Sequence, residues 1–316
     1  MLQPDCRWTR SVLVSVSLVL APVHSFRAEA QPHVVGPELQ NKAISVLRTA
    51  MKEGAAFEKV HAAEALIWTG HPEGIEEYYR EEDRTASSEF SYRIGIWRVL
   101  YRFNAGNPAG QQEYLARILA VFSDPKAQDQ ATAAETLGKL KYAGADCTKL
   151  VLDLAEHGKD DLRVWARWIL ANSGKIEDEA HLAKFLCSKS PPDRANAAYA
   201  FRYCKTILPA TLKAIEDLAA TEPADGEVRY YVLGTLYTHL PADQRESAKR
   251  ELLRYAVAGN TDQRYQACMA LANWPTEDMI QVVEKLLGNK PVDERVGAAY
   301  VLLRMGQPRD KVDPNH

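Results

Sequence analysis

The chain contains eight copies of one short pattern, and this repetition constrains its fold more than any other sequence feature. The copies occupy residues 60–70, 92–103, 130–140, 162–174, 194–204, 228–240, 263–274 and 294–306. A small or branched apolar residue lies at the centre of each copy, and successive centres are 31 to 38 residues apart: Ala63, Ile96, Ala134, Ala166, Ala198, Val232, Ala267 and Ala298. Periods of this length are typical of proteins built from stacked repeats.

Each copy has the apolar periodicity of a helix. When the central residue is position 0, positions +3 and +4 are mostly apolar, as at Leu66 and Ile67, and these positions share one helix face. An acidic residue that can favour a helix N-terminus precedes six copies, at Asp129, Asp161, Asp193, Glu227, Asp262 and Asp293. Glycine follows four copies, where a helix would end in a left-handed turn, at Gly70, Gly144, Gly174 and Gly306.

A second helical pattern precedes each copy, so the sequence predicts eight helix pairs. These patterns occupy residues 37–54, 73–82, 110–122, 147–158, 178–187, 211–222, 245–259 and 277–288. No stretch alternates apolar and polar residues over the length of a strand, which predicts an all-α protein. One pair cannot bury its own apolar stripe, but stacked pairs form a continuous core.

An arginine column runs through the copies, three positions before the centre, and an alanine and leucine follow it. Its members are Arg93, Arg163, Arg229, Arg264 and Arg295, with Arg194 one residue earlier in its copy. This pattern resembles the HEAT family, particularly the short bacterial form related to the phycobilisome lyases. The resemblance implies a right-handed α-solenoid over residues 31–306, in which the arginines form a ladder with acidic residues. Val60 and Ala131 replace the arginine in copies one and three and would interrupt that ladder.

The first thirty residues predict export. Arg7 and Arg10 precede an apolar run over residues 11–23, and a small-x-small site ends at Ala30, which is the order of a cleavable signal peptide. This run of thirteen residues, which includes serines, is shorter than the roughly 20 apolar residues that span a bilayer. We therefore expect a periplasmic or secreted protein without membrane insertion after cleavage. Residues 307–316 are expected to form a polar C-terminal tail.

The charge balance argues against nucleic acid as a partner. Cleavage would remove three basic residues from 39 and two acidic residues from 42, which leaves 36 and 40 and a net charge of −4. Proteins that bind nucleic acid or anionic membranes rely on concentrated positive charge. The four remaining cysteines lie in different repeats, and we expect them to be isolated thiols (Cys147, Cys187, Cys204 and Cys268).

No strong catalytic motif is present, so the sequence predicts a protein without catalytic residues, cofactor or metal. It lacks GxSxG, GxxxxGK[ST], GxGxxG, CxxC and HExxH patterns. Asp178 and His181 share a helix face, but they would supply only two of the three or four ligands that a metal site needs. The His-Glu pairs of the HEAT-like deoxyhypusine hydroxylases are missing, and the bilin lyases of the same family act in compartments that conflict with a signal peptide.

Aromatic residues and arginines concentrate at the positions that point away from the predicted core, which are +1, +5, −2 and +2. The candidate partner-binding residues among them are Trp97, Tyr101, Trp168, Tyr199, Tyr203, Tyr230, Arg98 and Arg167. Tryptophan, tyrosine and arginine are enriched at binding hot spots. In a curved solenoid these side chains would line a concave groove along the stack. The alternative is that the same aromatics fill the packing between repeats.

These patterns suggest an exported, non-catalytic scaffold that binds a protein partner along its concave aromatic face. The alternative is an accessory module for extracellular carbohydrate breakdown or uptake, in which tryptophan and tyrosine stack on the sugar rings of a glycan. An accessible groove would favour binding, whereas burial of the aromatics between repeats would remove the support for that face.

Overall fold

A computed structural model describes residues 35–307 except 87, 160 and 289–290. These residues form sixteen α-helices and three short 3₁₀ helices, and no strand occurs among them. The all-α prediction is therefore confirmed. The predicted signal peptide, residues 1–30, lies outside the described residues, as does all but the first residue of the predicted tail. Within the described ranges, no helix combines the length and apolar character of a membrane span.

Eight helices form an inner layer, and they correspond to the eight copies of the sequence pattern. Each one packs against the inner helix before it and the inner helix after it. In chain order they are α2 (Ala56–Trp68), α4 (Tyr92–Phe103), α6 (Gln130–Lys139), α8 (Asp161–Ala171), α10 (Pro191–Arg202), α12 (Arg229–His239), α14 (Thr261–Leu271) and α16 (Val292–Met305).

The other eight α-helices form an outer layer, each beside an inner helix. They are α1 (Pro37–Glu53), α3 (Ile75–Ala86), α5 (Pro108–Ser123), α7 (Thr148–His157), α9 (Ile176–Ala183), α11 (Pro209–Thr221), α13 (Glu246–Ala258) and α15 (Ile280–Leu286). The 3₁₀ helices are η1 (Lys184–Cys187), which follows α9, η2 (Ala242–Gln244), which precedes α13, and η3 (Glu277–Met279), which precedes α15.

The central residues of the eight copies explain why the inner helices pack closely. Ala63, Ile96, Ala134, Ala166, Ala198, Val232, Ala267 and Ala298 are all completely buried. Small side chains at such positions let neighbouring helix backbones approach one another. Gly138 of α6 shows the closest approach, because a Cβ atom there would lie 2.4 Å from the indole ring of Trp168. The core therefore runs between the two layers around the whole molecule.

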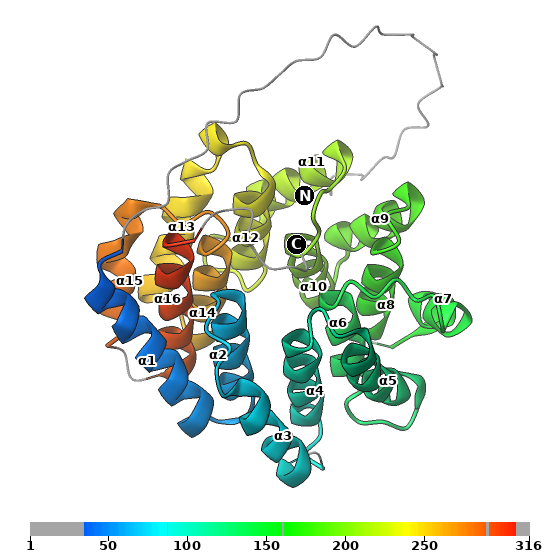
Figure 1. The fold of residues 1–316 in the computed structure, drawn as a ribbon. Helices are drawn as coiled ribbons and strands as arrows, with labels where there is room; N and C mark the ends of the chain where they lie inside the picture. Colours follow the sequence, from blue (N-terminus) through cyan, green and yellow to red (C-terminus); the bar gives the residue numbers. More distant parts are fainter. Residues whose placement is uncertain (1–34, 87, 160, 289–290, 308–316) are drawn as a thin grey trace, which may run out of the picture.

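The two ends of the repeat array meet. The last helix, α16, packs against both α1 and α2, so the first and last pairs lie side by side (Figure 1). A Cβ atom on Gly306 would lie 3.2 Å from the side-chain amide of Gln40. The array is thus a closed ring of eight helix pairs. The helices of the sequence copies therefore line the inner face, and closure makes that face the wall of a central space, where the sequence predicted a groove along the stack.

The helix ends follow most of the predicted signals. Gly70, Gly144 and Gly174 have positive φ angles of 80°, 74° and 77°, as expected for left-handed turns after a helix. Gly306 instead has a φ of −82°, so the left-handed turn expected there does not form. Asp129 is the N-cap residue of α6 but makes no side-chain cap; its carboxylate accepts hydrogen bonds from Arg93 instead.

Candidate binding site at the centre of the ring

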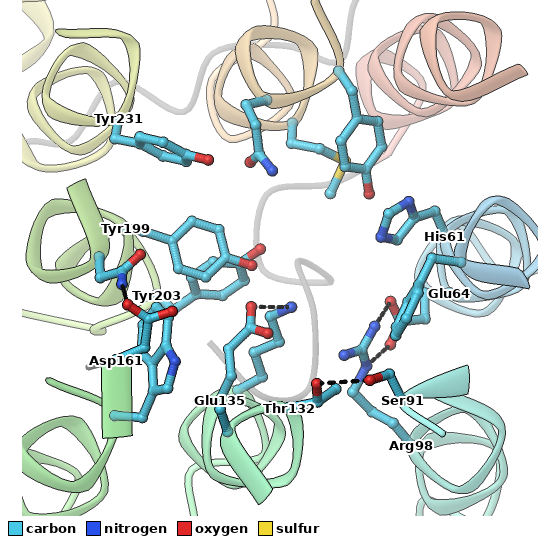
Figure 2. A pocket seen from close by; sticks show the side chains of 18 of the residues that line it. His61, Glu64, Ser91, Arg98, Thr132, Glu135, Asp161, Tyr199, Tyr203 and Tyr231 are labelled. Atoms are coloured by element: carbon cyan, nitrogen blue, oxygen red, sulfur yellow. Dashed lines mark hydrogen bonds and ion pairs between the residues drawn. The ribbon is translucent and has the colours of Figure 1, made fainter. Parts of the chain in front are cut away.

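A cavity of about 400 Å³ lies inside the ring and is lined by seven of the eight inner helices. Figure 2 shows the labelled side chains converging on it from several directions: His61 and Glu64 from α2, Arg98 from α4, Glu135 from α6, Tyr199 from α10, Tyr203 from the C-cap of α10, and Tyr231 from α12. The volume lies near the lower end of the range of about 300–1,000 Å³ for small-molecule sites. Its lining combines charged side chains with tyrosine and tryptophan rings.

Five charged residues of α2, α4 and α6 form one side of the cavity, which we name the charged wall: Glu64, Arg98, Arg102, Glu135 and Lys139. Arg98 binds the Glu64 carboxylate in a bidentate manner, with Nε 2.6 Å from Oε1 and Nη2 3.1 Å from Oε2. Nη1 of Arg102 lies 3.1 Å from Oε1 of the same carboxylate. The side chains of these three residues are only 2–5% exposed. One carboxylate thus lies between two buried guanidinium groups.

The two arginines keep Glu64 ionised. Burial alone would raise the pKa of this carboxyl group, but the charges of Arg98 and Arg102 outweigh that effect and lower the pKa to about 2. Arg98 is further fixed by a 3.3 Å hydrogen bond from Nη1 to the hydroxyl of Thr136 on α6. The ion pairs of Glu64 with Arg98 and Arg102 therefore join α2 to α4, and the hydrogen bond to Thr136 extends the network to α6.

Glu135 and Lys139 continue the charged wall along α6. Lys139 Nζ lies 2.8 Å from Glu135 Oε1, one helical turn away (Figure 2). Burial alone would raise the pKa of the Glu135 carboxyl group, but the charges of Lys139 and then Arg98 outweigh this effect and lower the pKa. Lys139 Nζ also lies 5.4 Å from the centroid of the Tyr199 ring, which places it where the charged side meets the aromatic side.

Four aromatic residues of α8, α10 and α12 form another side, which we name the aromatic wall: Trp165, Tyr199, Tyr203 and Tyr231. The Tyr199 ring is at their centre, with ring centroids 6.1 Å from Trp165, 5.0 Å from Tyr203 and 5.8 Å from Tyr231. Edge-to-face and tilted contacts of this kind hold rings in fixed orientations. The fully buried indole of Trp168 supports Tyr199 from behind.

Arg202 anchors the aromatic wall although it does not line the cavity. Its Nη2 donates to the Tyr203 hydroxyl at 3.2 Å and to Gln266 Oε1 at 2.9 Å, which connects α10 to α14. The guanidinium carbon lies 5.0 Å from the centroid of the Tyr199 ring. The Arg202 guanidinium therefore fixes the positions of Tyr199 and Tyr203 from behind the aromatic wall.

Further polar groups complete the lining. His61 of α2 stacks on Tyr265 of α14 with ring centroids 4.4 Å apart, and its Nδ1 lies 3.1 Å from Asp293 Oδ1 of α16. These two contacts also hold together the helices where the ring closes. Across the cavity from Arg98, Asp161 accepts a 2.7 Å hydrogen bond from Asn196 (Figure 2). Within the described residues, no three histidine, cysteine, aspartate or glutamate side chains lie close enough together to hold a metal ion.

Three of the eight residues proposed from sequence lie at the cavity, namely Arg98, Tyr199 and Tyr203. Trp168 is fully buried behind the aromatic wall. Trp97 is also buried, and its Nε1 donates a 2.7 Å hydrogen bond to Asp83 of the outer helix α3. The prediction that these tryptophans line an accessible groove is therefore wrong.

The remaining three residues also lie away from the cavity lining. The hydroxyl of the buried Tyr230 donates to Asp262 at 2.7 Å. Nη1 of Arg167 lies 3.1 Å from Nδ1 of His181, which belongs to the outer helix α9. Tyr101 is partly buried against the core. Five of the eight proposed residues therefore lie in packing contacts outside the cavity lining, as the alternative interpretation expected for the aromatics.

The arginine column forms ion pairs between successive repeats. Four of the five arginines contact an acid of the following pair: Arg93 with Asp129 at 2.8 Å, Arg163 with Asp193 at 3.6 Å, Arg229 with Glu251 at 2.9 Å, and Arg264 with Glu294 at 2.8 Å. Arg194 adds a 2.6 Å pair with Glu222. The Nε of the fifth arginine, Arg295, is buried and has no hydrogen-bond partner among the described residues.

Sequence reasoning proposed Arg98 of the charged wall but missed its two carboxylates, Glu64 and Glu135. Glu64 and Glu135 occupy position +1, the same repeat position as Tyr199, and Lys139 occupies +5, the same position as Tyr203. A search for aromatic residues at these positions passes over the carboxylates. A charged residue directly after the buried centre of a repeat is the signal that would have found them.

Comparison with models of known protein families finds no match to this chain, and comparison with curated proteins finds no significant match either.

Proposed function

We propose that this protein is a non-catalytic binding protein that holds a small saccharide in the centre of its ring. The observation that carries the proposal is the arrangement of the cavity, in which an ionised, hydrogen-bonding wall faces a wall of aromatic rings. A sugar has both complementary features, because its hydroxyl groups form hydrogen bonds and its C–H faces pack on aromatic rings. The ligand class is thus the glycan that the sequence offered as the alternative partner.

The protonation state of the two carboxylates in the charged wall favours a binding role over catalysis. Hydrolysis of a glycoside requires a protonated carboxylic acid beside the leaving group, usually with a raised pKa. The pKa values of both Glu64 and Glu135 are lowered, by the two arginines and by Lys139 respectively. Both carboxylates would accept hydrogen bonds from sugar hydroxyls, and neither is suited to donate a proton.

A protein partner along an open aromatic face has less support. It would require Trp97 and Trp168, and both side chains are buried. The large apolar side chains that are exposed among the described residues are Phe90, Leu152, Ile176 and Val257, which come from different parts of the chain. Single exposed apolar residues of this kind are normal on any protein surface, whereas protein interfaces need a contiguous patch.

We also propose that the ring is a closed form of a HEAT-like solenoid and that residues 1–30 direct its export. The first proposal is supported by the 31–38-residue period and by the ladder of arginine ion pairs between repeats. The second is supported by the order of charged, apolar and small residues at the start of the chain. An exported saccharide-binding protein would serve carbohydrate breakdown or uptake outside the cytoplasm.

The proposal is tested by titration calorimetry of the purified protein with a panel of neutral and acidic mono- and disaccharides. Tyr231→Ala removes an aromatic side chain from the cavity, and we expect it to weaken binding of the best ligand about tenfold, equivalent to about 1.4 kcal/mol. The matched control is Tyr101→Ala, which removes a partly buried tyrosine outside the lining and should leave affinity unchanged. Absence of binding by the whole panel at millimolar concentration would overturn the proposed function.

A further inference from the structure

The charged wall carries one more positive than negative charge. Its three cations are Arg98, Arg102 and Lys139, and its two carboxylates are Glu64 and Glu135. The sixth charged group in the lining with a fixed sign, Asp161, lies on the opposite side of the cavity beside Asn196 (Figure 2). A buried cation without a matching anion is costly. Within the wall, Arg98 and Arg102 share the one carboxylate of Glu64, so the excess positive charge lies at these two arginines, and Asp161 balances it only from across the cavity.

Arg102 is the cation whose hydrogen bonds are incomplete. Its side chain is 3% exposed, and its Nε and Nη1 have no hydrogen-bond partner among the described residues, although Nη1 makes the ion pair with Glu64. The guanidinium lies 4.6 Å from the ring centroid of Trp68, which also lines the cavity. The buried Nε1 of Trp68 likewise has no hydrogen-bond partner in the described part of the chain. Two neighbouring residues of the lining thus hold buried donors without a hydrogen-bond partner among the described residues.

These observations identify the chemistry that this part of the lining would accept. A carboxylate supplies a second negative charge beside the two arginines, and its oxygens accept hydrogen bonds from a guanidinium in a planar geometry. A neutral hydroxyl group would supply an acceptor but no charge. Asp161 and Asn196, across the cavity, are suited to the hydroxyl groups at the other end of the same ligand.

We propose that the saccharide is a hexuronic acid whose carboxylate binds at Arg102 and Trp68 while its ring faces the aromatic wall. This inference rests on the proposed saccharide-binding function and specifies its ligand class. Arg102 is then the residue that sets specificity for acidic over neutral sugars, and Glu64 is the positioning residue that holds its guanidinium.

The experiment titrates the full chain with four probes: D-glucuronate, D-galacturonate, the methyl ester of D-glucuronate and D-glucose. We expect at least one of the two acids to bind about tenfold more tightly than the ester and the neutral sugar, as a charge-assisted hydrogen bond implies. Sodium acetate at the same concentration controls for a site that takes any small carboxylate. Binding of acetate as tight as that of the acids would overturn the proposed uronate specificity.

Arg102→Gln tests the residue assignment, and Arg304→Gln is its matched control. Arg304 occupies the equivalent position of α16 and is buried, but it does not line the cavity; its Nη1 donates to Gln307 at 3.1 Å. We expect Arg102→Gln to abolish the preference for the acid over the ester, and Arg304→Gln to preserve it. The double variant Glu64→Gln/Arg102→Gln removes one charge of each sign, and it replaces Arg102→Gln in the titrations if the single variant does not fold.

The outcomes separate this inference from the function on which it rests. Equal affinity for acid, ester and glucose would overturn the uronate assignment and leave saccharide binding standing. A preference for the acid that survives in both Arg102 variants would overturn the role of Arg102. Failure of all four probes and of the wider saccharide panel would overturn the proposed function itself.

Discussion

The charged wall depends on Glu64, because its carboxylate contacts both Arg98 and Arg102. We predict that Glu64→Gln lowers the free energy of unfolding by about 3–5 kcal/mol, since it leaves two buried guanidinium groups without an anion. Chemical denaturation followed by circular dichroism at pH 7 measures this loss. Glu113→Gln is the matched control, because Glu113 forms an exposed pair with Arg117 and should change stability by less than about 1 kcal/mol.

The same carboxylate predicts how stability depends on pH. Its pKa is lowered from 4.5 to about 2 in the folded protein, so its contribution is present above pH 4.5 and is lost as pH falls toward 2. The shift corresponds to about 3 kcal/mol. Denaturation curves between pH 6 and pH 2.5 should therefore show a decline in unfolding free energy that is smaller in Glu64→Gln. Identical declines in the two proteins would contradict the ionised state of Glu64.

At the scale of elements, close contact between α6 and α8 depends on a residue without a side chain. A Cβ atom at Gly138 would lie 2.4 Å from Cε3 of Trp168, whose indole is fully buried and supports Tyr199. We predict that Gly138→Ala destabilises the protein by about 1–3 kcal/mol despite the better helix propensity of alanine. Gly288→Ala is the control, because the nearest atom there is an ordinary contact at 3.5 Å. A stabilised Gly138→Ala protein in thermal unfolding would show that the helices can separate at no cost.

The sequence predicted the buried face of each inner helix but not the rotation of each helix about its axis. The central residues are all buried as expected, because apolar side chains at a fixed period place one face of each helix in the core. In α4, positions +2 and +6, at Arg98 and Arg102, face the cavity where α10 uses +1 and +5. One residue rotates a helix face by about 100°, so Trp97 at +1 of α4 points toward Asp83 of α3 instead.

At the scale of the whole molecule, closure of the ring is what creates the site. The closure brings His61 to Asp293, residues that are 232 positions apart, and the repeat pattern contains no signal for this contact. The curvature of a repeat array is the sum of small rotations between neighbouring pairs, which a one-dimensional pattern does not specify. The gap in the arginine column at Val60 coincides with the closure, but an interrupted ladder does not by itself distinguish an open end from a closed one.

The closure predicts that the chain tolerates circular permutation. Residues 36 and 306 can be joined by about six glycine and serine residues, because the start of α1 lies beside the end of α16, and new termini can be opened in the exposed loop between Pro125 and Lys126. We expect the permuted protein to be monomeric, with the helix content and melting temperature of a 36–306 chain of natural order. In an open stack the short linker could not reach, and the permuted chain would aggregate or lose its cooperative transition.

The central claim is that a saccharide binds inside the ring, between the charged wall and the aromatic wall. The most direct test is a crystal structure of the full mature chain with the sugar that binds most tightly in the titrations. We predict electron density for its ring within the cavity, in contact with Tyr199 or Tyr231 and with polar atoms near Arg102 and Asp161. The account would be contradicted if the sugar were fully occupied at a site on the outer helices while the central cavity held only solvent.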